Sequence, residues 1–184
     1  MTMQIAEFIA VGMLNFKIME SQLISKARSL AFAYHKKQRY GNRPYSAHLQ
    51  MVVNFARIYS ELIPKEARED VICAAYLHDI LEDTLCTQDE ILRALNPRIL
   101  LIVKLLTKNS SNLEDYFNQV AKDDLAIFVK LCDRYANILS SVQDENLEKL
   151  IKYREQNPTF IRTLLLEKYN DLFEAIEWIL KAYQ

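Results

Sequence analysis

The stretch that decides the fold is Val71-Ile72-Cys73-Ala74-Ala75-Tyr76-Leu77-His78-Asp79-Ile80-Leu81-Glu82-Asp83-Thr84. Its first seven residues are apolar on every face, which predicts a helix that is buried on all sides. If the helix continues at about 100° per residue, His78, Asp79, Glu82 and Asp83 share one arc of about 140°. Three acids buried together need a positive partner, and a divalent cation is the simplest one. The alternative is a helix end that emerges into solvent, with His78 as an ordinary polar residue.

The rest of the chain has the composition of a helical globular protein. Of its 184 residues, 51% are hydrophobic and 26% are charged, while Gly occurs twice and Pro four times. So few backbone breakers favour long helices, and two distant glycines cannot form the phosphate loop of a P-loop or Rossmann protein. Apolar positions recur at helical spacing almost throughout. We predict an all-α fold, a single compact multi-helix domain over 1–184, with helices near 3–15, 20–38, 46–61, 65–83, 88–95, 97–107, 112–121, 123–142, 145–156 and 158–182.

Helix boundaries are predicted where start and stop signals cluster. Asn96-Pro97 and Asn157-Pro158 look like pairs of a capping residue and a first helical residue. Residues 40–45 form the one clear irregular loop. The C-terminal helices over 158–182, with Trp178 near their end, are expected to pack against the core and to have no chemical role.

Charge and cysteine content limit the partners and the location. The formal net charge is −1 without a basic stripe, which argues against a nucleic-acid partner. The three cysteines form no C-x-x-C pair and are expected to be buried reduced thiols, which suits a reducing cytosol. The apolar segment 5–14 contains Glu7, is too short to span a bilayer and follows no basic segment; Met13 or Met19 could also be the true start. We expect a packed first helix, no membrane partner and a cytoplasmic protein.

Two further segments contain candidate metal ligands. His48 follows a Pro-Tyr loop and begins an apolar helix, and Asp133 interrupts a nearly continuous apolar run over 125–137. Lys130 and Asn137 share the helical face of Asp133. Taken alone, His48 would be a capping or core residue, and Asp133 would pair with Lys130 or Arg134.

Together these segments resemble the HD superfamily of metal-dependent phosphohydrolases. Within it they are most similar to small alarmone hydrolases and to the hydrolase domain of bifunctional Rel/Spo-type enzymes. The resemblance covers roughly residues 25–155. Three motifs support it: Pro44-Tyr45-Ser46-Ala47-His48, His78-Asp79-Ile80-Leu81-Glu82-Asp83-Thr84, and Lys130-Leu131-Cys132-Asp133-Arg134-Tyr135-Ala136-Asn137.

The resemblance implies one divalent metal, typically Mn²⁺, held by His48, His78, Asp79 and Asp133. The chemistry of a mixed nitrogen and oxygen site agrees, because it suits manganese, iron, cobalt or nickel better than magnesium. Glu82 and Asp83 match the acidic pair that orients the attacking water and moves protons.

The resemblance also implies contacts with a guanosine nucleotide. Arg39 matches a residue that packs on the guanine, a task that Tyr40 or Arg43 could share, and Asn137 matches a contact to the ribose. Lys104 and Lys108 either meet substrate phosphates or are ordinary solvated charges. The residues expected to bind substrate are Arg39, Asn137, Lys130, Tyr45, Lys108 and Tyr153.

The sequence departs from the family pattern at two places. Leu49 stands where the family usually has Pro after the first histidine. The segment 35–41 matches only with a one-residue shift, which leaves open which residue contacts the base. His35 is expected to be an exposed residue at a helix end, or else a phosphate contact.

Three functions compete at this point. The first is an alarmone hydrolase of the stringent response that removes the 3′-pyrophosphate of guanosine tetra- or pentaphosphate. The second is another HD nucleotidase or phosphodiesterase with the same metal site. The third is a catalytically silent nucleotide-binding regulator. The sequence leaves a homo-oligomer open.

Overall fold

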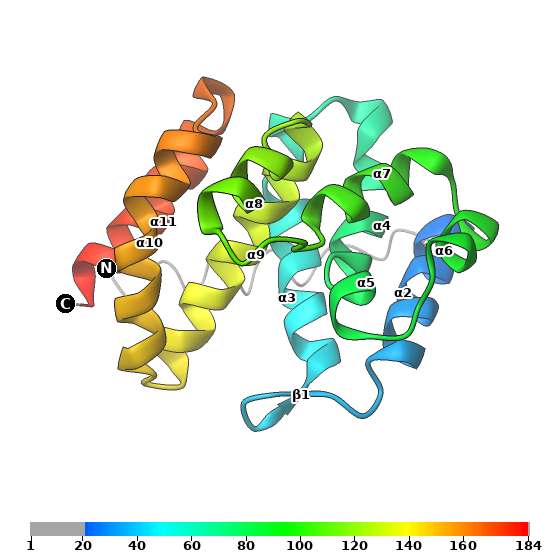
Figure 1. Ribbon diagram of the computed structural model, residues 1–184, viewed down its shortest axis with the longest axis horizontal. Helices are drawn as coiled ribbons and strands as arrows, with labels where there is room; N and C mark the ends of the chain where they lie inside the picture. Colours follow the sequence, from blue (N-terminus) through cyan, green and yellow to red (C-terminus); the bar gives the residue numbers. More distant parts are fainter. Residues whose placement is uncertain (1–20, 184) are drawn as a thin grey trace.

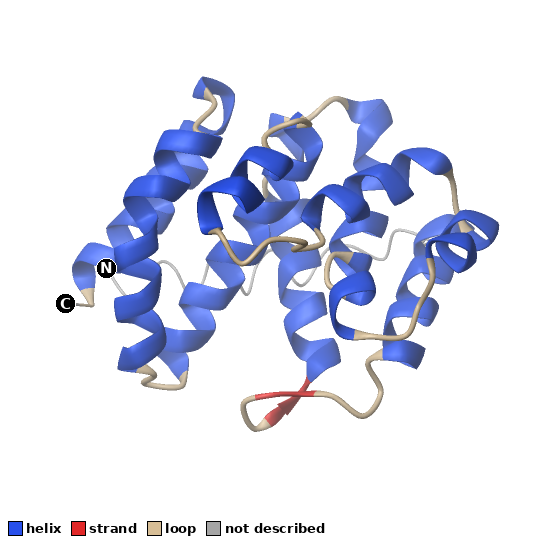
Figure 2. Ribbon diagram, viewed as in Figure 1, coloured by secondary structure: helices blue, strands red, loops and turns tan. Residues whose placement is uncertain are grey.

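The computed structural model describes residues 21–183, which form packed helices and one short hairpin (Figures 1 and 2). The helix predicted over 3–15 lies outside these residues. The elements are α2 (Gln22–Tyr34), β1 (Arg39–Tyr40), β2 (Arg43–Pro44), α3 (Tyr45–Ile58), η1 (Ser60–Leu62), η2 (Lys65–Ala67), α4 (Arg68–Leu77), α5 (Ile80–Asp83), α6 (Gln88–Ala94), α7 (Pro97–Leu106), α8 (Leu113–Val120), α9 (Asp124–Gln143), α10 (Leu147–Leu164), η3 (Glu167–Tyr169) and α11 (Asn170–Ala182).

Helix α4 is buried along most of its length, as its uninterrupted apolar sequence predicts. Every residue from 71 to 77 is buried, and the helix contacts α2, α3, α7 and α9. Helix α9 packs against α3 on one side and against α10 and α11 on another (Figure 1). The all-α prediction is therefore confirmed, and α3, α4 and α9 lie next to one another in the middle of the fold.

The prediction of one continuous helix over 65–83 is wrong after residue 77. Helix α4 ends at Leu77, and a separate short helix, α5, begins at Ile80. The backbone turns at Asp79, with φ −103° and ψ −1°. The continuous helix assumed for the common arc is therefore interrupted between His78 and Asp79 on one side and Glu82 and Asp83 on the other.

Residues 39–44 form a small β-hairpin instead of an irregular loop. Arg39 pairs with Pro44 and Tyr40 with Arg43. Gly41 occupies the turn with φ +57°, in the left-handed region that glycine adopts without strain. The hairpin leads directly into α3 and so fixes the approach to His48.

The helix boundary predicted at Asn157-Pro158 is also wrong, because α10 continues through Pro158 and the chain breaks only after Leu164. A proline inside a helix costs about 3 kcal/mol, so tertiary contacts must offset it. Among these contacts is the Arg134 guanidinium, which lies 4.7 Å from the Tyr153 ring and 4.6 Å from the Phe160 ring. Tyr153 precedes the proline and Phe160 follows it, so both halves of α10 contact the same guanidinium.

The remaining expectations concern the cysteines and the membrane. Cys73, Cys86 and Cys132 are buried and free, as expected. Between residues 21 and 183, no helix combines the length and the hydropathy that crossing a bilayer requires.

Candidate metal centre

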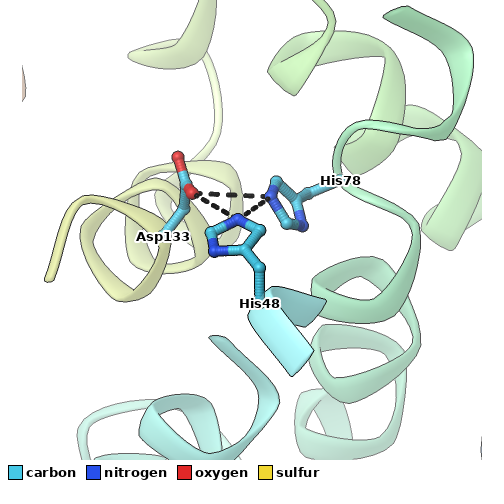
Figure 3. A group of neighbouring side chains, drawn as sticks. All are labelled: His48, His78 and Asp133. Atoms are coloured by element: carbon cyan, nitrogen blue, oxygen red, sulfur yellow. Dashed lines mark hydrogen bonds and ion pairs between the residues drawn. The ribbon is translucent and has the colours of Figure 1, made fainter. Parts of the chain in front are cut away.

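Three of the four expected ligands come together from three different helices (Figure 3). His48 lies in the first turns of α3, His78 caps the end of α4, and Asp133 lies in the middle of α9. All three are buried, with exposed fractions of 2%, 2% and 5%. The packing of α3 against α4 and α9 therefore creates the cluster.

The ligand atoms form a nearly equilateral triangle. His48 Nε2 lies 3.4 Å from His78 Nε2 and 3.3 Å from Asp133 Oδ1, and His78 Nε2 lies 3.5 Å from the same oxygen. Atoms bound at about 2.1 Å to one metal ion are separated by about 3.0 Å at right angles and about 3.4 Å at the tetrahedral angle. The spacing fits a single bound cation.

The protonation of His78 supports the same conclusion. Its Nδ1 lies 2.9 Å from the Ala75 carbonyl oxygen, which can only accept, so Nδ1 carries the hydrogen. In the neutral ring Nε2 then has a lone pair that faces Asp133 Oδ1 and, at 2.9 Å, Asp79 Oδ2. Three acceptors that face one another need a proton or a cation between them. A backbone contact that fixes the tautomer in this way is typical of histidines that bind metals.

Asp133 is held from both sides of its carboxylate. Lys130 Nζ lies 2.9 Å from Oδ2, and Asn137 Nδ2 donates to Oδ1 at 2.6 Å. Lys130 itself lies over the Tyr116 ring, 5.2 Å from its centroid. These contacts orient Oδ1 toward the two histidines.

Asp79 lies beside the triangle. Its Oδ2 contacts His78 Nε2 and accepts a hydrogen bond from the Tyr45 hydroxyl. Only the ligand atoms of His48, His78 and Asp133 form a group in which all lie within 4.8 Å of one another; among the described residues, Asp79 is not part of this group. Its role as a fourth ligand therefore stays a prediction.

The electrostatics of the cluster show how strongly these groups interact. Burial opposes charge on His78, but Asp79 and Asp133 outweigh it and raise its pKa well above the ordinary value. Burial also opposes ionisation of Asp79, but His78 outweighs it and lowers the pKa of Asp79 to about 2. The pKa of Asp133 is lowered mainly by Lys130 and the two histidines, against the effect of burial. Without a metal, the cluster holds a proton where a cation would bind.

His48 is positioned by packing. Its ring stacks on Tyr40 with centroids 4.6 Å apart and planes 10° apart, and the Tyr45 ring stands edge-on at 5.5 Å. Its buried Nδ1 has no hydrogen-bond partner within residues 21–183. Tyr40 also donates from its hydroxyl to Asn137 Oδ1 at 2.5 Å. The hairpin thus contacts one ligand directly and a second, Asp133, through Asn137.

The acidic pair lies on α5, just beyond the cluster. Glu82 and Asp83 are exposed, and the Glu82 carboxylate accepts a hydrogen bond from the Lys108 backbone at 2.9 Å. Partial burial raises the pKa of each carboxyl group, and the negative charge of Asp79 raises both further. Such carboxyl groups are suited to exchange protons with a bound molecule.

The residues expected to bind substrate fall into two groups. Asn137, Lys130 and Tyr45 contact Asp133 or Asp79, so the structure places them around the ligands. The others lie further out. Arg39 is exposed and donates to the Asn42 carbonyl, the Lys108 side chain is exposed, and the half-buried Tyr153 ring packs on Arg134. Arg43, an alternative base contact, pairs with Asp144 at 3.0 Å.

The expectation that His35 is exposed is wrong. Its side chain is buried, with 2% exposed, and its ring stacks on Tyr45. Gln38, which was not expected near the site, contacts His35 Nδ1. The spacing of three residues between them is the one signal in the sequence that could have paired them.

Comparison with known proteins identifies the family. The HD domain model matches residues 45–138, just over half of the chain. Two relatives named GTP pyrophosphokinase rsh, from Brucella melitensis and Brucella suis, are each 31% identical over 129 residues. The match covers 63% of this chain but only 16% of each relative.

A solved structure has a similar fold. It is described as a metazoan ortholog of SpoT that hydrolyses ppGpp, and it superposes with a TM-score of 0.68 over 88% of this chain and 96% of that chain, at 19% identity. The buried cluster of two histidines and an aspartate offers the donor atoms for one divalent metal ion, which agrees with this family match. The chain belongs to the HD domain family.

Proposed function

We propose that this protein hydrolyses the 3′-pyrophosphate of guanosine tetra- and pentaphosphate, with one divalent metal, Mn²⁺, held by His48, His78, Asp79 and Asp133. The observation that carries the proposal is the triangle of ligand atoms formed by His48, His78 and Asp133. The matched structure is described as a ppGpp hydrolase, and this chain covers 96% of it. The name pyrophosphokinase describes relatives of which the match covers 16%, so it does not decide between synthesis and hydrolysis.

In the proposed reaction, water attacks the phosphorus atom bonded to the ribose O3′. The bond between that phosphorus and O3′ breaks, and the products are a guanosine nucleotide with a free 3′-hydroxyl and pyrophosphate. When bound, a divalent cation supplies Lewis acidity toward the phosphate oxygens. Glu82 and Asp83 accept the proton of the attacking water and return one to the leaving O3′, roles that fit their raised pKa values.

The residues around the ligands hold this site in shape. Lys130 and Asn137 fix Asp133, and Tyr45 fixes Asp79. Lys108 and Tyr153 remain proposed contacts to the nucleotide. A cytoplasmic location is part of the proposal, because a guanosine nucleotide is a substrate of the cytosol.

A second candidate keeps the metal site and changes the nucleotide. The observation in its favour is the Arg39 guanidinium, which donates to a carbonyl of its own hairpin. The Tyr40 ring also stacks on His48 and has Lys149 Nζ 4.9 Å from its centroid. Both groups therefore already contact other parts of the protein in place of a base.

The test is turnover of ppGpp by the purified protein with and without Mn²⁺, following GDP and pyrophosphate. We expect Mn²⁺-dependent release of both products and loss of turnover and bound Mn²⁺ in Asp79→Ala. Arg39→Ala should raise KM more than it lowers kcat if this residue holds the base. Turnover of other nucleotides in place of ppGpp would support the second candidate, and binding of nucleotides without any turnover would support a silent regulator.

A further inference from the structure

His35 joins three segments that surround the metal centre. It caps the end of α2, and its ring stacks on Tyr45 with centroids 4.7 Å apart and planes 16° apart. Its Nδ1 contacts Gln38 Oε1, and Gln38 Nε2 donates to the Asp83 carbonyl oxygen at 2.7 Å. The end of α2 and the start of α3 therefore meet at this imidazole, and Gln38 links it to the end of α5.

The hydrogen bonds fix the tautomer of this ring. The Asp83 carbonyl oxygen can only accept, so the Gln38 amide nitrogen must face it and Gln38 Oε1 must face His35. His35 Nδ1 consequently carries a hydrogen and donates it to Gln38. The ring orientation is set by a chain of contacts that ends on the backbone of α5.

The other nitrogen of the ring is left without a partner. His35 Nε2 is buried and makes no hydrogen bond within the described part of the chain. A buried polar atom without a partner costs about 1–3 kcal/mol. A phenyl ring would stack on Tyr45 without this cost, so stacking alone does not account for a histidine here. What the histidine adds is the contact to Gln38.

We propose that His35 is a positioning residue of the metal centre, which holds Tyr45 in place so that the Tyr45 hydroxyl fixes Asp79. The inference rests on the metal site of the proposed function. Tyr45 is the link because its hydroxyl donates to Asp79 Oδ2, whose neighbour at 2.9 Å is His78 Nε2. Tyr45 also stands edge-on to His48, so its displacement affects the surroundings of this ligand as well.

The test is the affinity of the full-length protein for Mn²⁺ alone, measured by electron paramagnetic resonance, with folding checked by circular dichroism. The variants are H35A, which removes the stacked ring, H35F, which keeps the ring and loses Gln38, and Y45F, which loses the hydroxyl. Y34F is the matched control, because Tyr34 precedes His35 on α2 and donates to Glu90 on α6, away from the cluster.

Loss of a group that supports a ligand typically weakens metal binding by about 10–100-fold. We expect H35A and Y45F each to weaken Mn²⁺ binding by about 10-fold, at the lower end of that range. H35F should fall between H35A and the native protein, and Y34F should bind as the native protein does. Because His35 acts through Tyr45, H35A/Y45F should bind no more weakly than Y45F.

Two results would overturn the inference. One is folded H35A with native affinity for Mn²⁺, and the other is a double variant in which the two losses multiply. If H35A does not fold, H35F decides, since native Mn²⁺ affinity in H35F contradicts the role of the histidine.

Two other results would bear on the proposed function instead. Native Mn²⁺ affinity in Asp79→Ala would refute the metal site. Missing ppGpp turnover with intact Mn²⁺ binding would refute only the proposed substrate.

Discussion

Replacement of Lys130 by methionine distinguishes a lysine that holds Asp133 from one that binds substrate. Lys130 Nζ lies 2.9 Å from Asp133 Oδ2, and its side chain is 20% exposed. Burial opposes charge on Lys130, but Asp133 outweighs it and raises the pKa of the lysine. Methionine keeps the unbranched apolar stem beside Tyr116 and removes only the charge. The substitution therefore leaves the Asp133 carboxylate with Asn137 as its remaining hydrogen-bond donor on α9.

The size of the effect follows from this geometry. Removing one partner of a buried ion pair costs about 3–5 kcal/mol. We expect about 3 kcal/mol, the lower end, because Asn137 still donates to Asp133 and Lys130 is partly exposed. In a chain of this length 1 kcal/mol changes Tm by about 2–4 °C, so Tm in the absence of metal should fall by about 6–12 °C. Excess Mn²⁺ should reduce the difference, because a bound cation compensates Asp133 in place of the lysine.

The assay is thermal unfolding followed by circular dichroism, in EDTA and in excess Mn²⁺. Lys26→Met, at an exposed position on α2, is the control for the loss of one lysine. A decrease in Tm no larger than that of the control would refute the reasoning. An increase in KM for the nucleotide without a change in Tm would show that Lys130 binds substrate.

Three further predictions concern the acidic pair, helix α10 and pH. Glu82→Gln should keep Mn²⁺ binding and lower kcat by about 10²–10⁴-fold, since it removes a proton acceptor and no ligand; loss of bound metal would contradict this. Pro158→Ala should raise the free energy of unfolding, measured in urea, by about 2 kcal/mol. A proline inside a helix destabilises the folded state by about 3 kcal/mol, while by restricting the unfolded chain it stabilises the protein by at most about 1 kcal/mol. A decrease in the free energy of unfolding would mean that α10 depends on the proline. Because the pKa of His78 is raised in the metal-free protein, its contribution to stability is present below about pH 6.5 and is lost as pH rises through the raised value. Thermal unfolding in EDTA should therefore show a fall in stability above neutral pH that Mn²⁺ removes, and a stability that rises with pH in EDTA would exclude it.

The sequence predicts the helical framework well where apolar periodicity is uninterrupted, as in α4 and α9. It does not predict the turn at Asp79, because Leu81 and Glu82 are good helix formers and nothing in the local sequence ends the helix there. It also places a helix boundary at Pro158, whereas α10 continues through this residue and contacts the buried Arg134 on both sides of it. In both cases tertiary packing overrides the local preference.

In the candidate site, too, some features are predicted by the sequence and others depend on tertiary packing. The motifs predict that His48, His78 and Asp133 meet, and the structure brings them together. The burial of His35 is not predicted, because two lysines follow it and suggest an exposed helix end. Its burial depends on contacts with Tyr45 and Gln38 that only the packed hairpin creates.

The arrangement of charges connects metal binding to the stability of the fold. Asp79 and Asp133 lie against His78, while the single positive charge of Lys130 is paired with Asp133. The acids of α5 add further negative charge nearby, so the cluster is short of positive charge unless a proton or a cation binds. A folded core normally avoids such a deficit, because buried charge without a partner is destabilising. The fold tolerates it because α4 is buried on all faces immediately before His78 and offsets the cost through apolar packing. The same deficit favours a divalent cation at the site, and it arises because the buried helix α4 leads directly into an acidic segment.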